Sequence, residues 1–180
     1  MTDSESTANQ KTPSLPATQN LVDALFVGVK DKGGKPIADH SRRCVNYLSP
    51  NTPYYVKLAT ALHDVIEDTP LTFADLRSLG YPQDTLNLLD AVTIRPGESY
   101  TGSINRLIGS KLFWALEMKL ADNKDNTDPE RLGRLDVDTK DRMEQRYAGV
   151  RDRLLEAMED LDPQWVAKHH PRDHKTSQDR

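Results

Sequence analysis

One stretch of the chain, residues 53–69, most constrains how this protein can fold. Its apolar side chains recur at the spacing that places them on one face of an α-helix: Leu58, Leu62, Val65 and Ile66. Pro53 suits the first turn of such a helix, and Pro70 prevents its continuation. The stretch therefore predicts a helix over roughly 53–67 that packs one face into a core.

The same stretch carries four ionisable side chains away from its apolar face. His63 and Glu67 are four positions apart, so they share a ridge of the predicted helix. Asp64 and Asp68 share the neighbouring ridge, and all four are predicted to line one side of a pocket. A solvated helix end would explain the last two carboxylates alone. A divalent cation explains the whole set, because it binds imidazole and carboxylate together and offsets the repulsion between anions near a helix C-terminus.

The rest of the central chain also has helical periodicity. Further helices are predicted over roughly 20–31, 37–48, 73–79, 82–93, 103–125 (as one or two helices) and 138–160. No useful run alternates apolar and polar residues, so the expected fold class is all-α with a single domain over 18–161. Residues 1–17 and the stretch from Lys168 onward are polar, and we expect a disordered arm over 1–17 and a flexible tail over 162–180.

Composition excludes several classes of protein. The formal net charge of −4 argues against a binder of duplex nucleic acid, which normally carries a basic surface. No apolar run approaches the ~18 residues of a membrane span, and the N-terminus lacks a signal-peptide pattern. The lone Cys44 cannot form an internal disulfide, and we expect it to be a small buried side chain. A cytoplasmic location is therefore expected. The apolar stripe from Met143 to Met158 leaves open a homo-oligomer.

Two other segments supply candidate partners for the ionisable cluster. His40 lies on the preceding predicted helix. Asp122 closes an apolar helix, and Asn126 lies four positions later, so both are expected to face one cavity. Together with His63 and Asp64, these segments offer two nitrogen and two oxygen ligands. Such a mixture suits Mn²⁺, Fe²⁺ or Zn²⁺ with positions left for water and substrate.

Four short motifs resemble a known family. They are "GGKPIADH" at 33–40, "ALHDVIEDT" at 61–69, "RPGESY" at 95–100 and "KLADNKDN" at 119–126. Together they resemble the HD-domain metal-dependent phosphohydrolases, and most closely the RelA/SpoT-type hydrolase domain and the small stand-alone alarmone hydrolases. The resemblance covers roughly 20–160, and it implies an all-α HD-domain bundle. The second motif is the most specific of the four.

The resemblance also implies roles for individual residues. The implied ligands, usually of Mn²⁺, are His40, His63, Asp64 and Asp122. Glu67 and Asp68 match the pair that positions and activates the attacking water, while Asn126 and Lys32 match substrate-binding residues. Arg95 is a further candidate for binding phosphate, because its Pro-Gly loop is able to approach the pocket. Other candidate phosphate cations are Lys119, Lys124 and Arg131.

Three positions depart from the family pattern. Asp31 stands where the pattern has Arg, Ile37 where it has an aromatic residue, and Asp128 where it has a basic residue. The expected activity is metal-dependent removal of the 3′-pyrophosphate from the alarmone (p)ppGpp, and these departures leave the substrate open. The alternatives are an HD-type phosphatase or pyrophosphohydrolase acting on another phosphorylated nucleotide, or a non-catalytic nucleotide- or partner-binding module.

Overall fold

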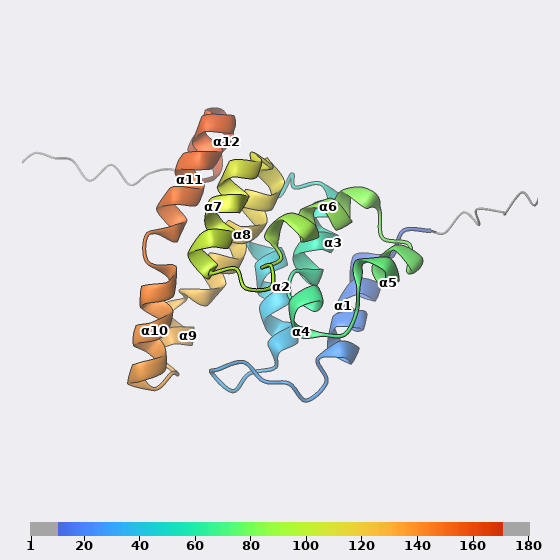
Figure 1. Ribbon diagram of the computed structural model, residues 1–180, viewed down its shortest axis with the longest axis horizontal. Helices are drawn as coiled ribbons and strands as arrows, with labels where there is room; N and C mark the ends of the chain where they lie inside the picture. The colour runs from blue at the N-terminus through green and yellow to red at the C-terminus, as the bar shows by residue number, and fades with distance from the viewer. Residues whose placement is uncertain (1–10, 171–180) are drawn as a thin grey trace, which may run out of the picture.

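The computed structural model describes residues 11–170, and this part of the chain is a bundle of twelve α-helices without a β-strand (Figure 1). The helices are α1 (Leu15–Leu25), α2 (Ile37–Tyr47), α3 (Tyr54–Leu62), α4 (Val65–Asp68), α5 (Phe73–Ser78), α6 (Gln83–Val92), α7 (Tyr100–Ser110), α8 (Phe113–Asn126), α9 (Pro129–Leu132), α10 (Val137–Tyr147), α11 (Val150–Leu161) and α12 (Pro163–His169). The predicted all-α class is confirmed.

Helix α8 is the centre of this arrangement. It packs against α2, α3, α6, α7 and α11, while α1 and α5 lie toward one end of the molecule and α10 toward the other (Figure 1). Its first half buries apolar side chains such as Leu116, but its second half buries polar ones: Asp122, Asn123, Asp125 and Asn126. Burial of so many polar groups is unfavourable unless each finds a partner. The last turns of α8 therefore mark the place where the bundle holds a polar site.

The helix predicted over 53–67 is broken at His63 and Asp64, which lie between α3 and α4. In a continuous helix the Thr60 carbonyl would accept a hydrogen bond from the Asp64 N–H. Here that carbonyl accepts from the His63 ring Nδ1 at 2.8 Å and from the His63 N–H at 3.5 Å. The side chain of His63 thus competes with the backbone. The break turns the imidazole toward α2 and α8.

The long helix predicted over 138–160 is also divided in two. Helix α10 ends at Tyr147, and α11 begins at Val150 after Gly149, whose φ of 67° lies in the left-handed region. Glycine reaches that region without the steric cost that a Cβ would add. Because the chain turns here, the last turn of α10 is directed to the polar end of α8 instead of continuing along it.

Both predicted boundaries of the domain differ from the observed helices. Helix α1 begins at Leu15, inside the predicted arm, since the Ser14 hydroxyl accepts from the Ala17 N–H at 3.2 Å and caps it. Residues 163–169, predicted as part of a flexible tail, form α12 because Val166 is buried and Trp165 packs edge-to-face on Phe113. The predictions for residues 1–10 and 171–180 lie outside the described residues.

Two local predictions are confirmed. Cys44 is fully buried beside Leu48 and Ala121. Helix α7 and helix α8 replace the single or double helix predicted over 103–125, with a left-handed turn at Lys111 between them. Over residues 11–170, every helix falls short of the length and apolar character that crossing a bilayer requires.

Candidate metal centre and substrate cavity

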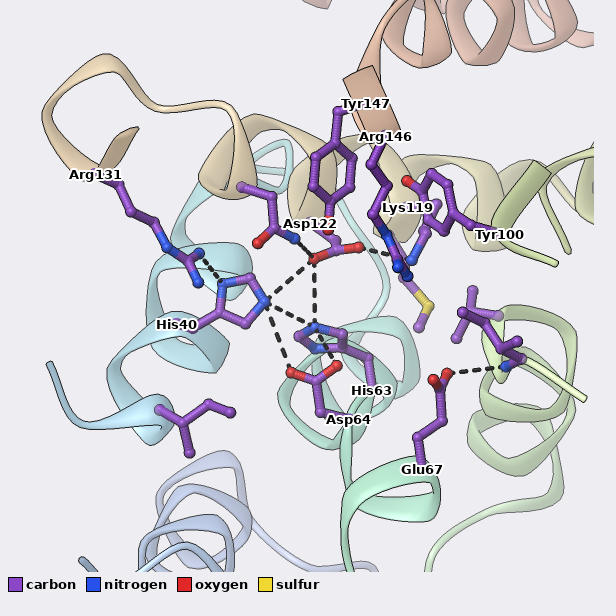
Figure 2. Close-up of a pocket in the computed structure, with 15 residues that line it drawn as sticks. His40, His63, Asp64, Glu67, Tyr100, Lys119, Asp122, Arg131, Arg146 and Tyr147 are labelled. Atoms are coloured by element: carbon purple, nitrogen blue, oxygen red, sulfur yellow. Dashed lines mark hydrogen bonds and ion pairs between the residues drawn. The ribbon is translucent and has the colours of Figure 1, made fainter. Parts of the chain in front are cut away.

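Three separate parts of the chain bring imidazole and carboxylate groups to one point (Figure 2). The Nε2 atoms of His40 and His63 lie 3.1 Å apart. Asp122 Oδ1 lies 3.2 Å from the first of these nitrogens and 3.7 Å from the second. Asp64 approaches from the other side, with Oδ1 3.2 Å from His63 Nε2 and Oδ2 3.7 Å from His40 Nε2. The four predicted ligands therefore converge.

Hydrogen bonds at the far side of each ring fix what the two Nε2 atoms present. His63 Nδ1 donates to the Thr60 carbonyl, and His40 Nδ1 lies 2.6 Å from Asp125 Oδ2. Each acceptor takes a proton, so in the neutral rings both Nε2 atoms carry lone pairs. Two lone pairs and two carboxylates then face one another without a proton between them. A cation resolves this conflict, and the donor set of two nitrogens and two oxygens fits a divalent metal ion.

The electrostatics of the cluster agree with that reading. Burial opposes a charge on His40 and His63, yet the Cys44 sulfur beside His40 and the carboxylates around both rings outweigh it and raise the pKa of both rings. Burial likewise opposes ionisation of Asp122, but Lys119 and the two imidazoles hold its pKa well below the ordinary value. The site thus favours ionised carboxylates and positive charge near the imidazole nitrogens. The same negative potential favours binding of a metal cation there.

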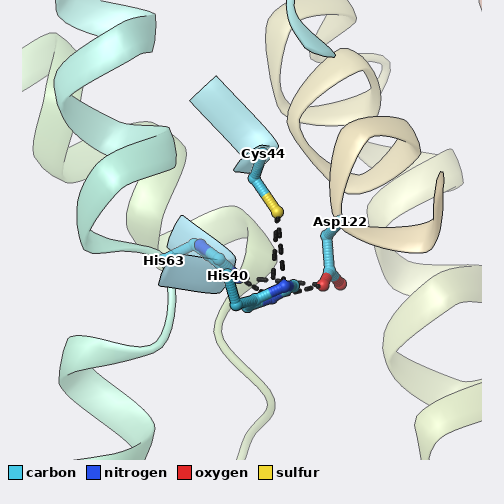
Figure 3. A group of neighbouring side chains, drawn as sticks. All are labelled: His40, Cys44, His63 and Asp122. Atoms are coloured by element: carbon cyan, nitrogen blue, oxygen red, sulfur yellow. Dashed lines mark hydrogen bonds and ion pairs between the residues drawn. The ribbon is translucent and has the colours of Figure 1, made fainter. Parts of the chain in front are cut away.

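Cys44 belongs to the same cluster, on the side of His40 that faces the core (Figure 3). Its Sγ lies 3.6 Å and 3.8 Å from the two ring nitrogens of His40. Burial raises the pKa of this thiol to about 11, so it is protonated at neutral pH. Cys44 packs beneath His40, and Asp64, which contacts both imidazoles, supplies a second carboxylate to the cluster.

Asp122 is held from both sides by residues of its own helix. Asn126 donates to Oδ1 at 2.5 Å, and Lys119 pairs with Oδ2 at 2.7 Å. Lys119 is partly buried, and despite the cost of burying its charge the carboxylate raises its pKa above the ordinary value. Both partners line the cavity with Asp122. The shared face predicted for Asp122 and Asn126 therefore exists.

Glu67 reaches the same cavity and is anchored to the loop before α7. Its Oε1 accepts from the Ile94 N–H at 2.9 Å. Arg106 fixes that loop, since it donates to the carbonyls of Ala91 and Thr93 and forms a two-pronged ion pair with Glu98. Burial raises the pKa of Glu67, as do the nearby carboxylates, and the Ile94 N–H opposes them. The result is a carboxylate that is more basic than usual and is anchored through one of its oxygens.

The cavity itself has a volume of about 170 Å³ and two unlike walls. The metal wall consists of the four converging residues predicted as ligands: His40, His63, Asp64 and Asp122. The opposite wall, here called the substrate wall, consists of Tyr100, Arg146 and Tyr147. The two tyrosine rings meet edge-to-face at a centroid distance of 5.3 Å, and the Arg146 guanidinium lies 4.3 Å from the centre of the Tyr100 ring. Figure 2 shows these three side chains grouped beside Lys119.

The fold of this chain is similar to that of a solved structure. The match has a TM-score of 0.61, at 21% sequence identity, over 86% of this chain and 99% of the other; that structure is described as "A metazoan ortholog of SpoT hydrolyzes ppGpp and plays a role in starvation responses". The chain shares the fold of a ppGpp hydrolase. The resemblance seen in the sequence motifs is thereby confirmed at the level of the fold. No family model matches the chain, and the curated proteins give no match.

The structure gathers most of the predicted site residues, although not all of them. His40, His63, Asp64, Glu67, Asp122 and Asn126 line one cavity. Three others do not line it. Asp68 is exposed on α4, Arg95 forms two 2.7 Å hydrogen bonds to Asp90 outside the cavity, and Lys32 is exposed with Nζ 3.5 Å from Met143 Sδ. Their roles remain predictions.

Sequence reasoning missed part of the substrate wall. Arg146 was absent from the candidate cations, and Tyr147 was assigned to a continuous apolar stripe. The signal that would have found them is Gly149, which lies in the turn between α10 and α11 and separates these residues from the rest of that stripe. Asp125 was missed as well, because nothing in the sequence shows that it lies against His40, 85 positions earlier.

Proposed function

We propose that this protein is a metal-dependent phosphohydrolase that removes the 3′-pyrophosphate from (p)ppGpp. The observation that carries the proposal is the convergence of two imidazole lone pairs and two carboxylates at one wall of a cavity. The shared fold with a structure described as hydrolysing ppGpp agrees with it. The proposed ligands are His40, His63, Asp64 and Asp122, and the ion is Mn²⁺, with Fe²⁺ or Zn²⁺ as alternatives.

A divalent ion bound there would supply Lewis acidity toward a phosphoryl group and would lower the pKa of a water ligand. The chain's own residues prepare the rest. Glu67, held by the Ile94 N–H through one oxygen, keeps its other oxygen available to accept a proton from the attacking water. Its raised pKa suits that task. Asp68 retains its predicted share in orienting the water.

The cationic groups of the cavity would bind the anionic substrate. The positive charge of Lys119 offsets the negative charge of Asp122, so the carboxylate repels an approaching phosphate less. Arg146 lies over the Tyr100 ring and forms no ion pair with any residue in 11–170. A guanidinium without a carboxylate partner is free to bind a phosphate oxygen. The two tyrosine rings beside it offer apolar area to a nucleoside.

The test is hydrolysis by the purified protein, with Mn²⁺ and with excess chelator. The substrates are ppGpp, pppGpp, ATP, GTP and the adenine 3′-pyrophosphate analogue. We expect pyrophosphate release from ppGpp with Mn²⁺ and none with chelator. Metal-dependent hydrolysis of another nucleotide, with ppGpp intact, would favour the alternative of an HD-type enzyme of different specificity. Absence of any metal-dependent hydrolysis would favour a non-catalytic binding module.

The alternative substrate has a specific observation behind it. The predicted substrate-binding residues Lys32 and Arg95 do not line the cavity and contact Met143 and Asp90 instead. The recognition of the nucleoside therefore depends on groups other than those that the resemblance implies. The adenine analogue in the panel tests this directly. Equal turnover of the guanine and adenine nucleotides would show that selectivity depends on the phosphate groups more than on the base.

A further inference from the structure

Three aspartates converge on one arginine at the end of the cavity near His40. Asp125 Oδ2 accepts from Arg131 Nη1 at 2.6 Å. Asp31 Oδ2 lies 3.5 Å from Arg131 Nε, and the Asp128 side chain accepts from the Arg131 backbone N–H at 2.9 Å. The three come from the loop before α2, from α8 and from the cap of α9. The carboxylates of Asp31 and Asp125 thus face the guanidinium itself, and that of Asp128 caps the backbone at Arg131; the three are called here the carboxylate cage.

The cage is buried and leaves little freedom to its arginine. The Arg131 side chain is 11% exposed, while those of Asp31 and Asp125 are 2% and 1% exposed. Asp31 Oδ2 has no hydrogen-bond partner in residues 11–170, so the ion pair with Arg131 is its compensation for burial. Removal of Arg131 would leave the buried Asp31 carboxylate without an ion-pair partner, which would lower the stability of the folded protein. Arg131 is thus held in one position before any ligand arrives.

The other oxygen of Asp31 explains why the loop is rigid. Oδ1 accepts from the Gly33 N–H and from the Lys35 N–H, each at 2.9 Å. These bonds shape the turn that precedes α2. One carboxylate therefore braces the loop through Oδ1 and orients Arg131 through Oδ2. Asp31, which departs from the family pattern, faces the arginine and not open solvent.

One part of the guanidinium remains available. Nε faces Asp31, and Nη1 faces Asp125 and also lies 3.2 Å from His40 Nδ1, whereas Nη2 makes no hydrogen bond to any residue within 11–170. Arg131 lines the cavity, and Figure 2 shows it beside His40, on the opposite side of the ligand cluster from Tyr100. A free N–H pair at this place suits a phosphate oxygen, since a preorganised guanidinium loses little freedom on binding.

We propose that Arg131 binds an anionic phosphate oxygen of the substrate through Nη2, and that Asp31, Asp125 and Asp128 hold it for that purpose. The proposal rests on the proposed function and adds the residue that reads the phosphate. Arg131 and Arg146 would then bind anionic groups at two ends of the cavity, with the metal wall between them. A substrate with two separated phosphate groups satisfies both, whereas a simple monophosphate satisfies one.

The experiment compares Arg131→Gln, Arg131→Lys and Asp31→Asn with the wild type. Arg42→Gln is the control, because Arg42 also pairs with two aspartates, Asp23 and Asp39, and does not line the cavity. The measurements are KM and kcat for ppGpp, the Kd of inorganic pyrophosphate for the Mn²⁺-loaded protein, the Mn²⁺ affinity and the melting temperature. The melting temperature identifies a variant that fails to fold, and Arg131→Lys, which keeps the charge, then carries the test.

We expect Arg131→Gln to raise KM and the pyrophosphate Kd by about 10- to 100-fold, the loss expected for a charge-assisted hydrogen bond. The Mn²⁺ affinity should change little, because Arg43 still holds Asp125 with hydrogen bonds of 2.6 Å and 3.0 Å. Arg131→Lys and Asp31→Asn should raise KM and the pyrophosphate Kd by less. Arg131→Lys keeps the positive charge and loses only the planar guanidinium, and Asp31→Asn loses only the negative charge that orients Arg131. Arg42→Gln should match the wild type.

Several outcomes would overturn the proposal. One is an unchanged KM and pyrophosphate Kd in Arg131→Gln. Another is a loss of Mn²⁺ affinity that accounts for the whole effect, since it would show that Arg131 acts through His40. A Mn²⁺-loaded wild type that does not bind pyrophosphate would overturn it too. If the wild type leaves ppGpp intact but binds pyrophosphate in an Arg131-dependent way, the proposed function fails while this inference stands.

Discussion

The metal wall and the substrate wall of the cavity are built on different physical principles. On the metal wall three of the four proposed ligands are held by a further residue: Thr60 and Asp125 fix the two imidazoles, and Lys119 and Asn126 fix Asp122. On the substrate wall, Tyr100 and Arg146 lack such support from the residues that the structure describes. The Tyr100 hydroxyl is buried without a hydrogen-bond partner in the described chain, and Arg146 is an exposed residue that rests on an aromatic face.

This difference matches the different demands that metal binding and substrate binding place on the two walls. Metal ligation tolerates little displacement, so the ligands need fixed tautomers and orientations. Binding of a flexible anionic substrate tolerates more, and groups with unused hydrogen-bonding capacity can meet it when it arrives. The buried Tyr100 hydroxyl is such a group. We therefore expect substitutions on the metal wall to be severe and those on the substrate wall to be graded.

The largest effect is expected from Asp64→Ala, which removes a ligand without opening the core, because the side chain is 26% exposed. Both Mn²⁺ binding and hydrolysis should be lost, with a fall in kcat/KM beyond the ~10⁴-fold that loss of a general base alone can give. Metal content by mass spectrometry and turnover would be measured together. Full activity in the metal-free variant would show that these residues do not form a catalytic metal site.

A smaller but still large effect is expected from Glu67→Gln. The amide keeps an oxygen for the Ile94 N–H and cannot accept the proton of the attacking water. The fall in kcat should be about 10²- to 10⁴-fold, while the Mn²⁺ affinity stays near that of the wild type. Isothermal titration with Mn²⁺ and steady-state kinetics would separate the two. Parallel loss of both would place Glu67 among the ligands instead.

The mildest effect is expected from Arg146→Gln on the substrate wall. KM should rise by roughly 3- to 10-fold with kcat and Mn²⁺ affinity preserved, since an exposed guanidinium contributes about one charge-assisted contact. Raising the salt concentration should shrink this difference, because the contact is partly screened. Arg142→Gln, on the same helix with its Nη2 bonded to Thr139 at 2.9 Å, is the matched control. A fall in kcat as large as that of Glu67→Gln would remove the distinction between the walls.

Helical periodicity and short motifs predicted much of the fold and most of the metal wall. The i, i+4 spacing of Asp122 and Asn126 predicted a shared face, and the structure joins their side chains by a 2.5 Å hydrogen bond. The same reasoning placed Asp68 beside Asp64 and was wrong about a continuous helix, because the ring of His63 bonds to the Thr60 carbonyl and ends α3. Local spacing predicts a face only while the helix continues.

By itself, the sequence determined the all-α class, the position of most helices and the identity of the converging imidazole and carboxylate groups. These properties depend on residues that are near one another in the chain, where propensity and periodicity act. Tertiary structure alone decided which cations reach the cavity. Lys32 and Arg95 are drawn to Met143 and Asp90, while Arg131 is drawn in by Asp31 and Asp125, residues 100 and 6 positions away in the chain. A long, charged side chain is placed by the partners that surround it, and those partners become known only when the helices have packed.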